Sequence, residues 1–90
     1  MDVTIVTGPQ GPGKSLTATK LATGAYATLY SEAALQSLPA IPDTLIVEEF
    51  IPSEAMIKTL QTKSLSNLII CVVDWLDLVE GFKGFEVVRV

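Results

Sequence analysis

Eight residues near the start of the chain have the types and the spacing that bind a phosphate group: a glycine, four residues, then glycine, lysine and serine. The glycines allow the backbone to curl so that several N–H groups point at one anion, and a following helix adds its positive end. Lys14 is expected to contact the β- and γ-phosphates of a nucleotide, and the Ser15 hydroxyl is expected to bind Mg²⁺. The residues predicted to bind the nucleotide are Gly8, Pro9, Gln10, Gly11, Pro12, Gly13, Lys14, Ser15 and Leu16.

Two prolines distinguish this loop from the simplest form of the pattern. Neither Pro9 nor Pro12 has an N–H group to donate. Pro12 matters more, because it directly precedes Gly13, where such loops often donate to the β-phosphate. We therefore predict a loop whose shape is set in advance by its prolines, with a lost donor that allows for weaker affinity. The alternative is an ordinary turn rich in glycine and proline that happens to contain this string.

A pair of acids after a short apolar run is the second candidate for chemistry. Leu45, Ile46 and Val47 are followed directly by Glu48 and Glu49. Adjacent side chains of an extended strand point to opposite faces of the sheet, so the two acids are expected to hold different tasks. The alternative is a pair of solvated acids at a strand end.

Together the two motifs resemble the Walker A loop and the Walker B strand of the P-loop NTPase superfamily. The resemblance implies that Glu48 holds a water of the Mg²⁺ shell and that Glu49 polarises the attacking water. Glu48 stands where aspartate is usual and is one methylene longer, so its distance to Mg²⁺ must be adjusted. Glu49 matches the additional-strand, catalytic-glutamate division, which includes AAA+ and RecA-like ATPases. The implied cofactors are ATP and Mg²⁺, the implied metal site is Ser15 with Glu48, and the implied catalytic residues are Lys14 and Glu49.

Two more residues gain candidate roles from their predicted places in the sheet. Asp74 follows a predicted strand, and the carboxyl ends of parallel strands share the ligand side of a sheet. Its position resembles that of a sensor residue in ATPases, the alternative being a helix N-cap. Arg89 is the only arginine and lies near the end of the last predicted strand. It could act as an arginine finger on its own or a neighbouring subunit, or be a surface residue.

Short apolar runs alternate with helical patterns, which predicts βαβ units and a parallel sheet. The predicted strands are Asp2 to Thr7, Tyr26 to Tyr30, Thr44 to Phe50, Leu68 to Val73 and Phe85 to Val90. The predicted helices are Lys14 to about Thr23, Ser31 to Leu38, and one that begins after Ser53 as N-cap and has Lys63 in its last turn. The fold class is therefore α/β: a three-layer αβα sandwich with a five-stranded, mainly parallel sheet, as a P-loop NTPase core.

The first predicted helix has a face of small and apolar residues. Ala18, Leu21, Ala22 and Ala25 follow one another at helical spacing, so this face is expected to pack on the sheet. Gly24 is expected to end the helix.

Composition bounds the remaining possibilities. The chain has 90 residues, which predicts a single domain spanning 1–90. The net charge of −4 gives no general attraction for nucleic acid, and the absence of histidine argues against zinc sites and histidine-dependent triads. Cys71, the only cysteine, lies in an apolar run and is expected to be a buried thiol. No apolar run is long enough to span a bilayer, so we expect a cytoplasmic protein without membrane contact.

Three functions fit these motifs. The first is an ATPase that acts on an unknown protein or DNA partner, as small P-loop proteins of phages and viruses do in DNA replication, packaging or assembly. The second is a nucleotide-gated binding or assembly module with little hydrolysis, and the third is a P-loop fold used only for assembly. Self-association into a homo-oligomer is compatible with each. The guanine-specific Asn-Lys-x-Asp string is absent, which favours ATP.

Overall fold

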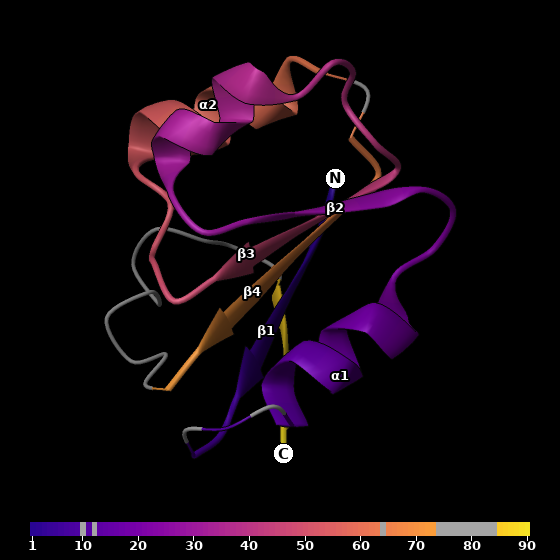
Figure 1. Cartoon of the computed structure of the whole chain (residues 1–90), viewed down its shortest axis with the longest axis vertical. Helices are drawn as coiled ribbons and strands as arrows, with labels where there is room; N and C mark the ends of the chain where they lie inside the picture. Colours follow the sequence, from indigo (N-terminus) through magenta and orange to yellow (C-terminus); the bar gives the residue numbers. More distant parts are fainter. Residues whose placement is uncertain (10, 12, 64, 74–84) are drawn as a thin grey trace.

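The computed structural model describes residues 1–9, 11, 13–63, 65–73 and 85–90. Within these residues, five strands form one sheet in the order β2-β3-β4-β1-β5, and every neighbouring pair is parallel (Figure 1). The strands are β1 (Asp2–Thr7), β2 (Tyr26–Leu29), β3 (Thr44–Glu48), β4 (Asn67–Val72) and β5 (Phe85–Arg89). The prediction of a five-stranded, mainly parallel sheet is confirmed.

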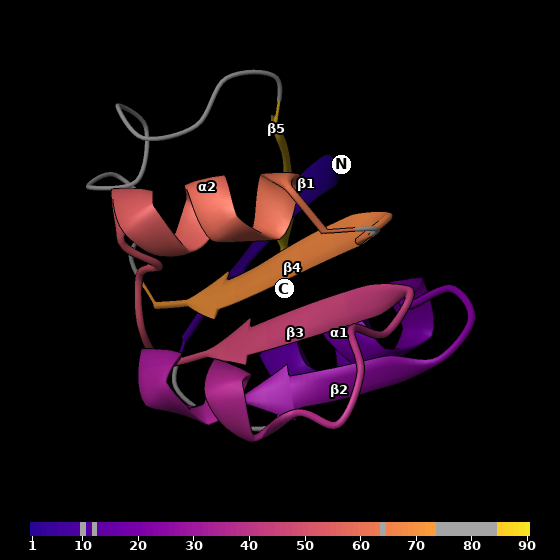
Figure 2. The same ribbon diagram turned by 90° about the horizontal axis from the view of Figure 1, so that it is seen from above.

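Helices lie on both sides of this sheet. They are α1 (Gly13–Leu21), the 3₁₀ helix η1 (Glu32–Ser37) and α2 (Glu54–Gln61). Figure 2 shows α2 in front of the sheet and α1 behind it. The side chains of the central strands alternate between the two faces of the sheet, because successive residues of a strand point in opposite directions. The segment Ser31 to Leu38, which was predicted to be a helix, contains a shorter 3₁₀ helix, Glu32–Ser37.

The two faces of the sheet carry separate cores. The smaller core lies under α1 and consists of Val6, Ala18, Ile46, Ile69 and Cys71. The larger core lies under α2 and η1 and consists of Val3, Ile5, Leu29, Leu45, Val47, Met56, Ile57, Leu60, Leu65, Leu68, Ile70 and Val72. Strands buried on both faces are nearly continuous runs of apolar residues, as expected for a parallel sheet. No helix in the described part of the chain is long and apolar enough to cross a membrane.

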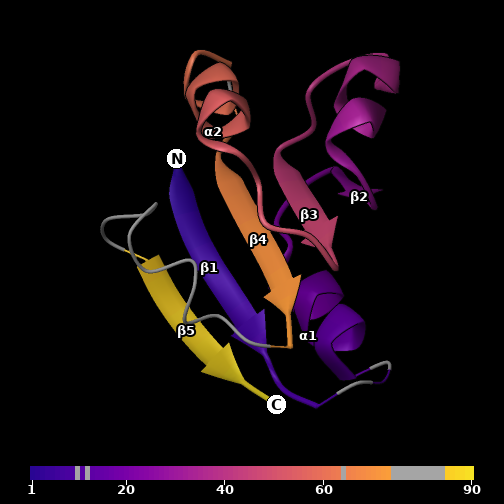
Figure 3. The same ribbon diagram turned by 90° about the vertical axis from the view of Figure 1, so that its left-hand side faces the viewer.

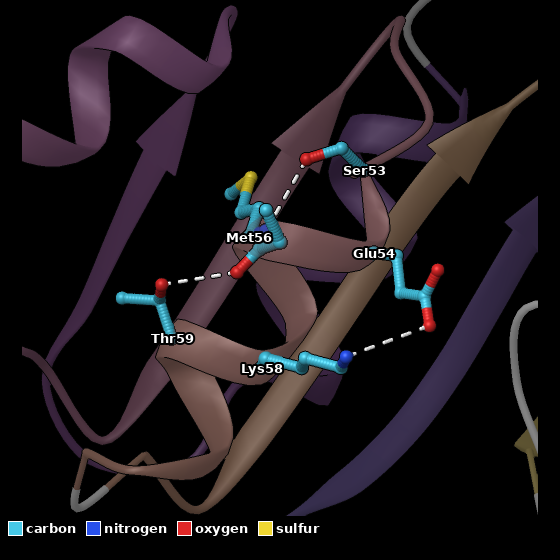
Figure 4. A network of polar contacts seen from close by, with 6 residues as sticks. Ser53, Glu54, Met56, Lys58 and Thr59 are labelled. Atoms are coloured by element: carbon cyan, nitrogen blue, oxygen red, sulfur yellow. Dashed lines mark hydrogen bonds and ion pairs between the residues drawn. The ribbon is translucent and has the colours of Figure 1, made fainter.

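The start of α2 follows the sequence prediction. The Ser53 side chain accepts a hydrogen bond of 3.2 Å from the Met56 backbone N–H (Figure 4). Met56, Ile57 and Leu60 are buried. The end of the helix differs, because α2 stops at Gln61 and Lys58 is the base in its last turn. Lys63 therefore lies beyond the helix and cannot hold the predicted place. Lys58 pairs instead with Glu54 at 3.8 Å, an exposed contact of small energetic value.

The apolar face of α1 is narrower than predicted. Ala18 is fully buried and Ala22 packs partly on the smaller core, but Leu21 is exposed and Ala25 lies outside the helix. The reason is that α1 ends at Leu21, two residues before the predicted end. Close packing of α1 on the sheet is therefore limited to the turn between Ala18 and Ala22.

Gly24 lies in the connection from α1 to β2 and not at the end of the helix. Its φ angle is +67°, a left-handed conformation that glycine adopts without a steric penalty. The neighbouring Ala25 N–H donates to Asp43 Oδ2 at 3.0 Å, and that carboxylate fills the space a Cβ on Gly24 would need. The turn before β2 is therefore hydrogen-bonded to Asp43, just before β3, and its close packing there requires glycine at position 24.

We expect Gly24→Ala to destabilise the protein by about 1–2 kcal/mol, since it adds left-handed strain and a clash with Asp43. Thermal unfolding should show this as a fall in Tm of several degrees. Ala33→Gly, in the exposed part of η1, is the matched control for a change of one methyl group. A Gly24→Ala variant as stable as the wild type would contradict the assigned role.

Candidate functional site

The predicted site residues meet at the carboxyl-terminal edge of the sheet. The arrowheads of β1, β3 and β4 point to this edge, and α1 begins beside it (Figure 3). In open parallel sheets this is the edge where ligands bind. A cleft of about 430 Å³ opens there, lined by Gly11, Lys14, Ser15, Glu48, Glu49, Phe50, Ile51, Cys71, Val72 and Val73. The structure thus brings together the loop and the acids that sequence reasoning had singled out.

The ammonium group of Lys14 lies inside the loop. Only 7% of this residue is exposed, and its Nζ donates to the Pro9 carbonyl at 2.6 Å and to the Gly8 carbonyl at 3.5 Å. A buried ammonium group needs such partners, because burial without them is costly. The positive charge is therefore held where the curl of the backbone would receive an anion.

Ser15 and Glu48 are in direct contact across the cleft. Ser15, in the first turn of α1, donates from Oγ to Glu48 Oε1 at 2.7 Å. Glu48 ends β3 and is only 7% exposed. A hydroxyl and a carboxylate are the hard oxygen donors that Mg²⁺ prefers, so this pair fits the cation.

Further ligands for such a cation would have to come from elsewhere. The described residues contain no group of three or more His, Cys, Asp or Glu side chains that could hold a metal ion. Mg²⁺ is commonly bound by one or two protein oxygens together with substrate phosphates and water. The donor set therefore fits a cation that arrives with a phosphate ligand.

Glu49 occupies an unusual backbone conformation. Its φ angle is +67°, the only positive value for a residue other than glycine in the described part of the chain. Its N–H donates to the Cys71 carbonyl at 3.1 Å, which fixes the chain just beyond β3. Glu48 is the last residue of β3 and is buried, whereas Glu49 lies just beyond the strand and is exposed, and both residues line the cleft. A strained position of this kind is typical of functional sites.

Comparisons with known proteins were made at the level of sequence and of structure. No family model, no curated protein and no solved structure matches this chain. The site is therefore interpreted from its own residues.

Cys71 and Thr7 are two site residues that sequence reasoning did not place. Cys71 is buried between Glu48 and Val6 in the strand register, and its Sγ donates to the Lys14 carbonyl at 3.8 Å. Burial, followed by the negative charge of Glu48, raises the pKa of the thiol to about 12. The buried Thr7 donates from Oγ1 to the Val73 carbonyl at 3.0 Å and joins the ends of β1 and β4. Counting back from the ends of the predicted strands could have found both.

The remaining predicted site residues have different outcomes. Leu16 is exposed in the first turn of α1, beside Ser15. Arg89 ends β5, where it is the register partner of Thr7 in β1, so it lies next to the strand that enters the loop. Gln10, Pro12 and Asp74 lie outside the described residues. The effect of Pro12 and the sensor role of Asp74 stay predictions.

We expect Cys71 to resist alkylation at pH 8, because the thiol is buried and its raised pKa keeps it protonated, whereas the thiolate is the reactive form. Labelling with iodoacetamide, followed by mass spectrometry, should give little product from the native protein and full modification in urea. Equal labelling rates in the two states would contradict the burial of this thiol.

Glu49→Gly and Glu49→Asn should each stabilise the protein by about 0.5–1 kcal/mol, because both residues tolerate a left-handed backbone better than glutamate. Denaturant unfolding measures this change. Glu54→Gly is the matched control, since Glu54 is an exposed glutamate in a regular helix and its replacement should destabilise. A loss of stability in Glu49→Gly as large as that in the control would disprove strain at residue 49.

Proposed function

We propose that this chain is a P-loop nucleotide-binding domain that binds ATP with Mg²⁺ and hydrolyses it. The observation that carries the proposal is the contact between Ser15 Oγ and Glu48 Oε1 at 2.7 Å, beside the buried ammonium group of Lys14. Residues that are far apart in the chain thereby place a cation, a hydroxyl and a carboxylate in one cleft. A bound triphosphate needs this combination, because the lysine ammonium group and a metal ion held by the two oxygens neutralise its negative charge.

The architecture supports the same proposal. In the described part of the chain one helix lies on one face of the sheet and two lie on the other, an arrangement that supports a three-layer αβα sandwich. The strand β4 lies between β1, which leads to the loop, and β3, which ends in the acids. An interposed strand of this kind agrees with the additional-strand division that Glu49 resembles.

Each residue of the cleft has a distinct task in the proposed reaction. Lys14 exchanges its contacts with backbone carbonyls for contacts with phosphate oxygens. Ser15 and Glu48 would hold Mg²⁺, which supplies charge neutralisation to the phosphates. Glu49 orients a water molecule and accepts its proton as the oxygen attacks the γ-phosphorus, while the bond from that phosphorus to ADP breaks. The carboxylate can reach such a water because Glu49 lines the cleft.

A second candidate function is nucleotide-gated binding with little hydrolysis. The exposure of Glu49 favours it, because efficient phosphoryl transfer needs a site from which bulk water is excluded. An unknown protein or DNA partner, or a second copy of the chain, would then complete the site. Turnover that rises steeply with protein concentration would point to such completion.

Nucleotide binding should raise the melting temperature in a Mg²⁺-dependent way. At about 100 times Kd, a ligand stabilises by roughly 2.7 kcal/mol, which in a domain of this size shifts Tm by about 10 °C or more. The comparison uses ATP, ADP and GTP, each with and without Mg²⁺. Lys14→Ala should abolish the shift, and Lys20→Ala, an exposed lysine of the same helix, should retain it. The absence of a shift in the wild-type protein would refute the proposal.

Hydrolysis should depend on Glu49 as well as on Lys14. Phosphate release should be lost in Lys14→Ala and reduced about 100-fold or more in Glu49→Gln, which retains the shape but not the base. Glu54→Gln, which changes an exposed acid of α2, should keep wild-type turnover. Equal turnover in the wild type and Lys14→Ala would exclude an ATPase at this site. A Tm shift without phosphate release would favour the gated module.

A further inference from the structure

The end of β5 lies against the glycine-rich loop. β5 pairs with β1 up to Arg89 beside Thr7, and the next residue, Val90, donates its N–H to the Thr7 carbonyl at 2.9 Å. The loop begins at Gly8, directly after Thr7. Val90 is thus hydrogen-bonded to the last residue before the loop, at the place where Figure 3 shows the end of β5 beside the chain that leaves β1.

The side chain of Val90 lies against the start of the loop and faces its last glycine. A Cβ on Gly8 would lie 2.7 Å from both the Cγ2 and the carbonyl oxygen of Val90, so only glycine fits there. A Cβ on Gly13 would lie 3.9 Å from the same Cγ2, which is ordinary van der Waals contact. One methyl group therefore occupies the space beside Gly8 and is the atom nearest to a side chain added at Gly13.

Val90 and the cleft lie on opposite sides of the loop. In the sheet, β1 is flanked by β4 on one side and by β5 on the other. The cleft is lined by residues that follow β3 and β4, whereas Val90 follows β5. Val90 therefore contacts the loop on the β5 side of β1, and the cleft on the β4 side stays open to a ligand.

The strand that carries Val90 lies at the edge of the sheet. Among the described strands β5 pairs with β1 only, and Glu86, Val87 and Arg89 are exposed on it. Phe85 packs partly on the larger core and Val88 partly on the smaller one, and Val90 itself is 46% exposed. Edge segments with few buried contacts open at low free-energy cost, well below that of global unfolding.

We propose that Val90 is a positioning residue that orders the phosphate-binding loop, so that phosphate binding and the docking of β5 are coupled. The proposal rests on the proposed function, because it assigns to that same site the strand that controls it. Val90 acts by packing against Gly8, on the side of Gly13, and does not touch the ligand. Coupling is reciprocal: a docked β5 raises the affinity for nucleotide, and a bound nucleotide protects β5 from opening.

The test compares Val90→Ala with Val87→Ala, which makes the same truncation on the same strand away from the loop. Val90→Ala should raise Kd for MgATP about three- to tenfold, which corresponds to the loss of part of one side chain's packing. Val87→Ala should leave Kd unchanged, and Val90→Ile, which retains Cγ2, should bind like the wild type. Exchange of the Val90 amide hydrogen should slow when MgATP is added.

A second measurement needs no nucleotide. Gly11 lies at the exposed part of the loop, and a Cβ there would meet nothing within 4 Å, so its amide reports loop order and not direct contact with Val90. NMR relaxation of the free protein should show a lower order parameter for the Gly11 amide in Val90→Ala and a wild-type value in Val87→Ala.

The outcomes separate this inference from the proposed function. A wild-type protein that binds no nucleotide overturns the proposed function and the coupling, and the Gly11 comparison then decides whether Val90 orders the loop. A wild-type protein that binds MgATP, with an unchanged Kd in Val90→Ala, overturns the coupling alone. Equal effects of Val90→Ala and Val87→Ala on both Kd and the Gly11 amide overturn the positioning role.

Discussion

The place of β1 between β4 and β5 is the constraint on which the candidate site depends. Because β1 hydrogen-bonds to β4 on one side and to β5 on the other, its end is fixed from both directions. The backbone that follows must turn away immediately, and α1 receives it on one face of the sheet. Lys14 and Ser15 are thereby held opposite the end of β3, although β3 and β1 do not touch. The distance spanned by β4 is what creates a cleft between the loop and the acids.

Charged groups are buried at this edge, and each has partners. Lys14 is surrounded by backbone carbonyls, and Glu48 accepts from Ser15 beside the Cys71 thiol. In the described part of the chain no buried side-chain nitrogen or oxygen lacks a hydrogen-bond partner. Such internal satisfaction keeps a small domain folded while it carries charge inside. A ligand must therefore replace existing hydrogen bonds and not merely fill space, which makes geometry decisive for affinity.

Much of the fold could be predicted from the sequence, because apolar runs and helix-capping residues act over a few neighbouring residues. Leu45 to Val47 form an apolar run typical of a buried strand, and Ser53 caps α2 by accepting from the backbone three residues further on. Lys63 and Ala25 were misplaced because helix ends depend on tertiary packing and not on periodicity. The loop and the two acids were found from residue types alone, since their chemistry requires those types. Their contact at 2.7 Å adds what no spacing reveals.

Other parts of the site had no local pattern to reveal them. The left-handed turn at Glu49 stands where β3 ends, two residues before the predicted end of the strand. The contact of Val90 with Gly8 joins residues at opposite ends of the chain. Thr7 and Cys71 are ordinary strand residues in the sequence, and only the parallel register gives them a place beside the loop and the cleft.

The backbone at Glu49 also has a consequence for how this chain can change over generations. Both codons for glutamate become glycine codons through a single base substitution, and glycine suits a φ angle of +67° better than any other residue. Random mutation therefore offers a relaxed backbone at this position repeatedly and in one step. Glutamate at position 49 therefore keeps the backbone in a conformation that one base substitution would relax.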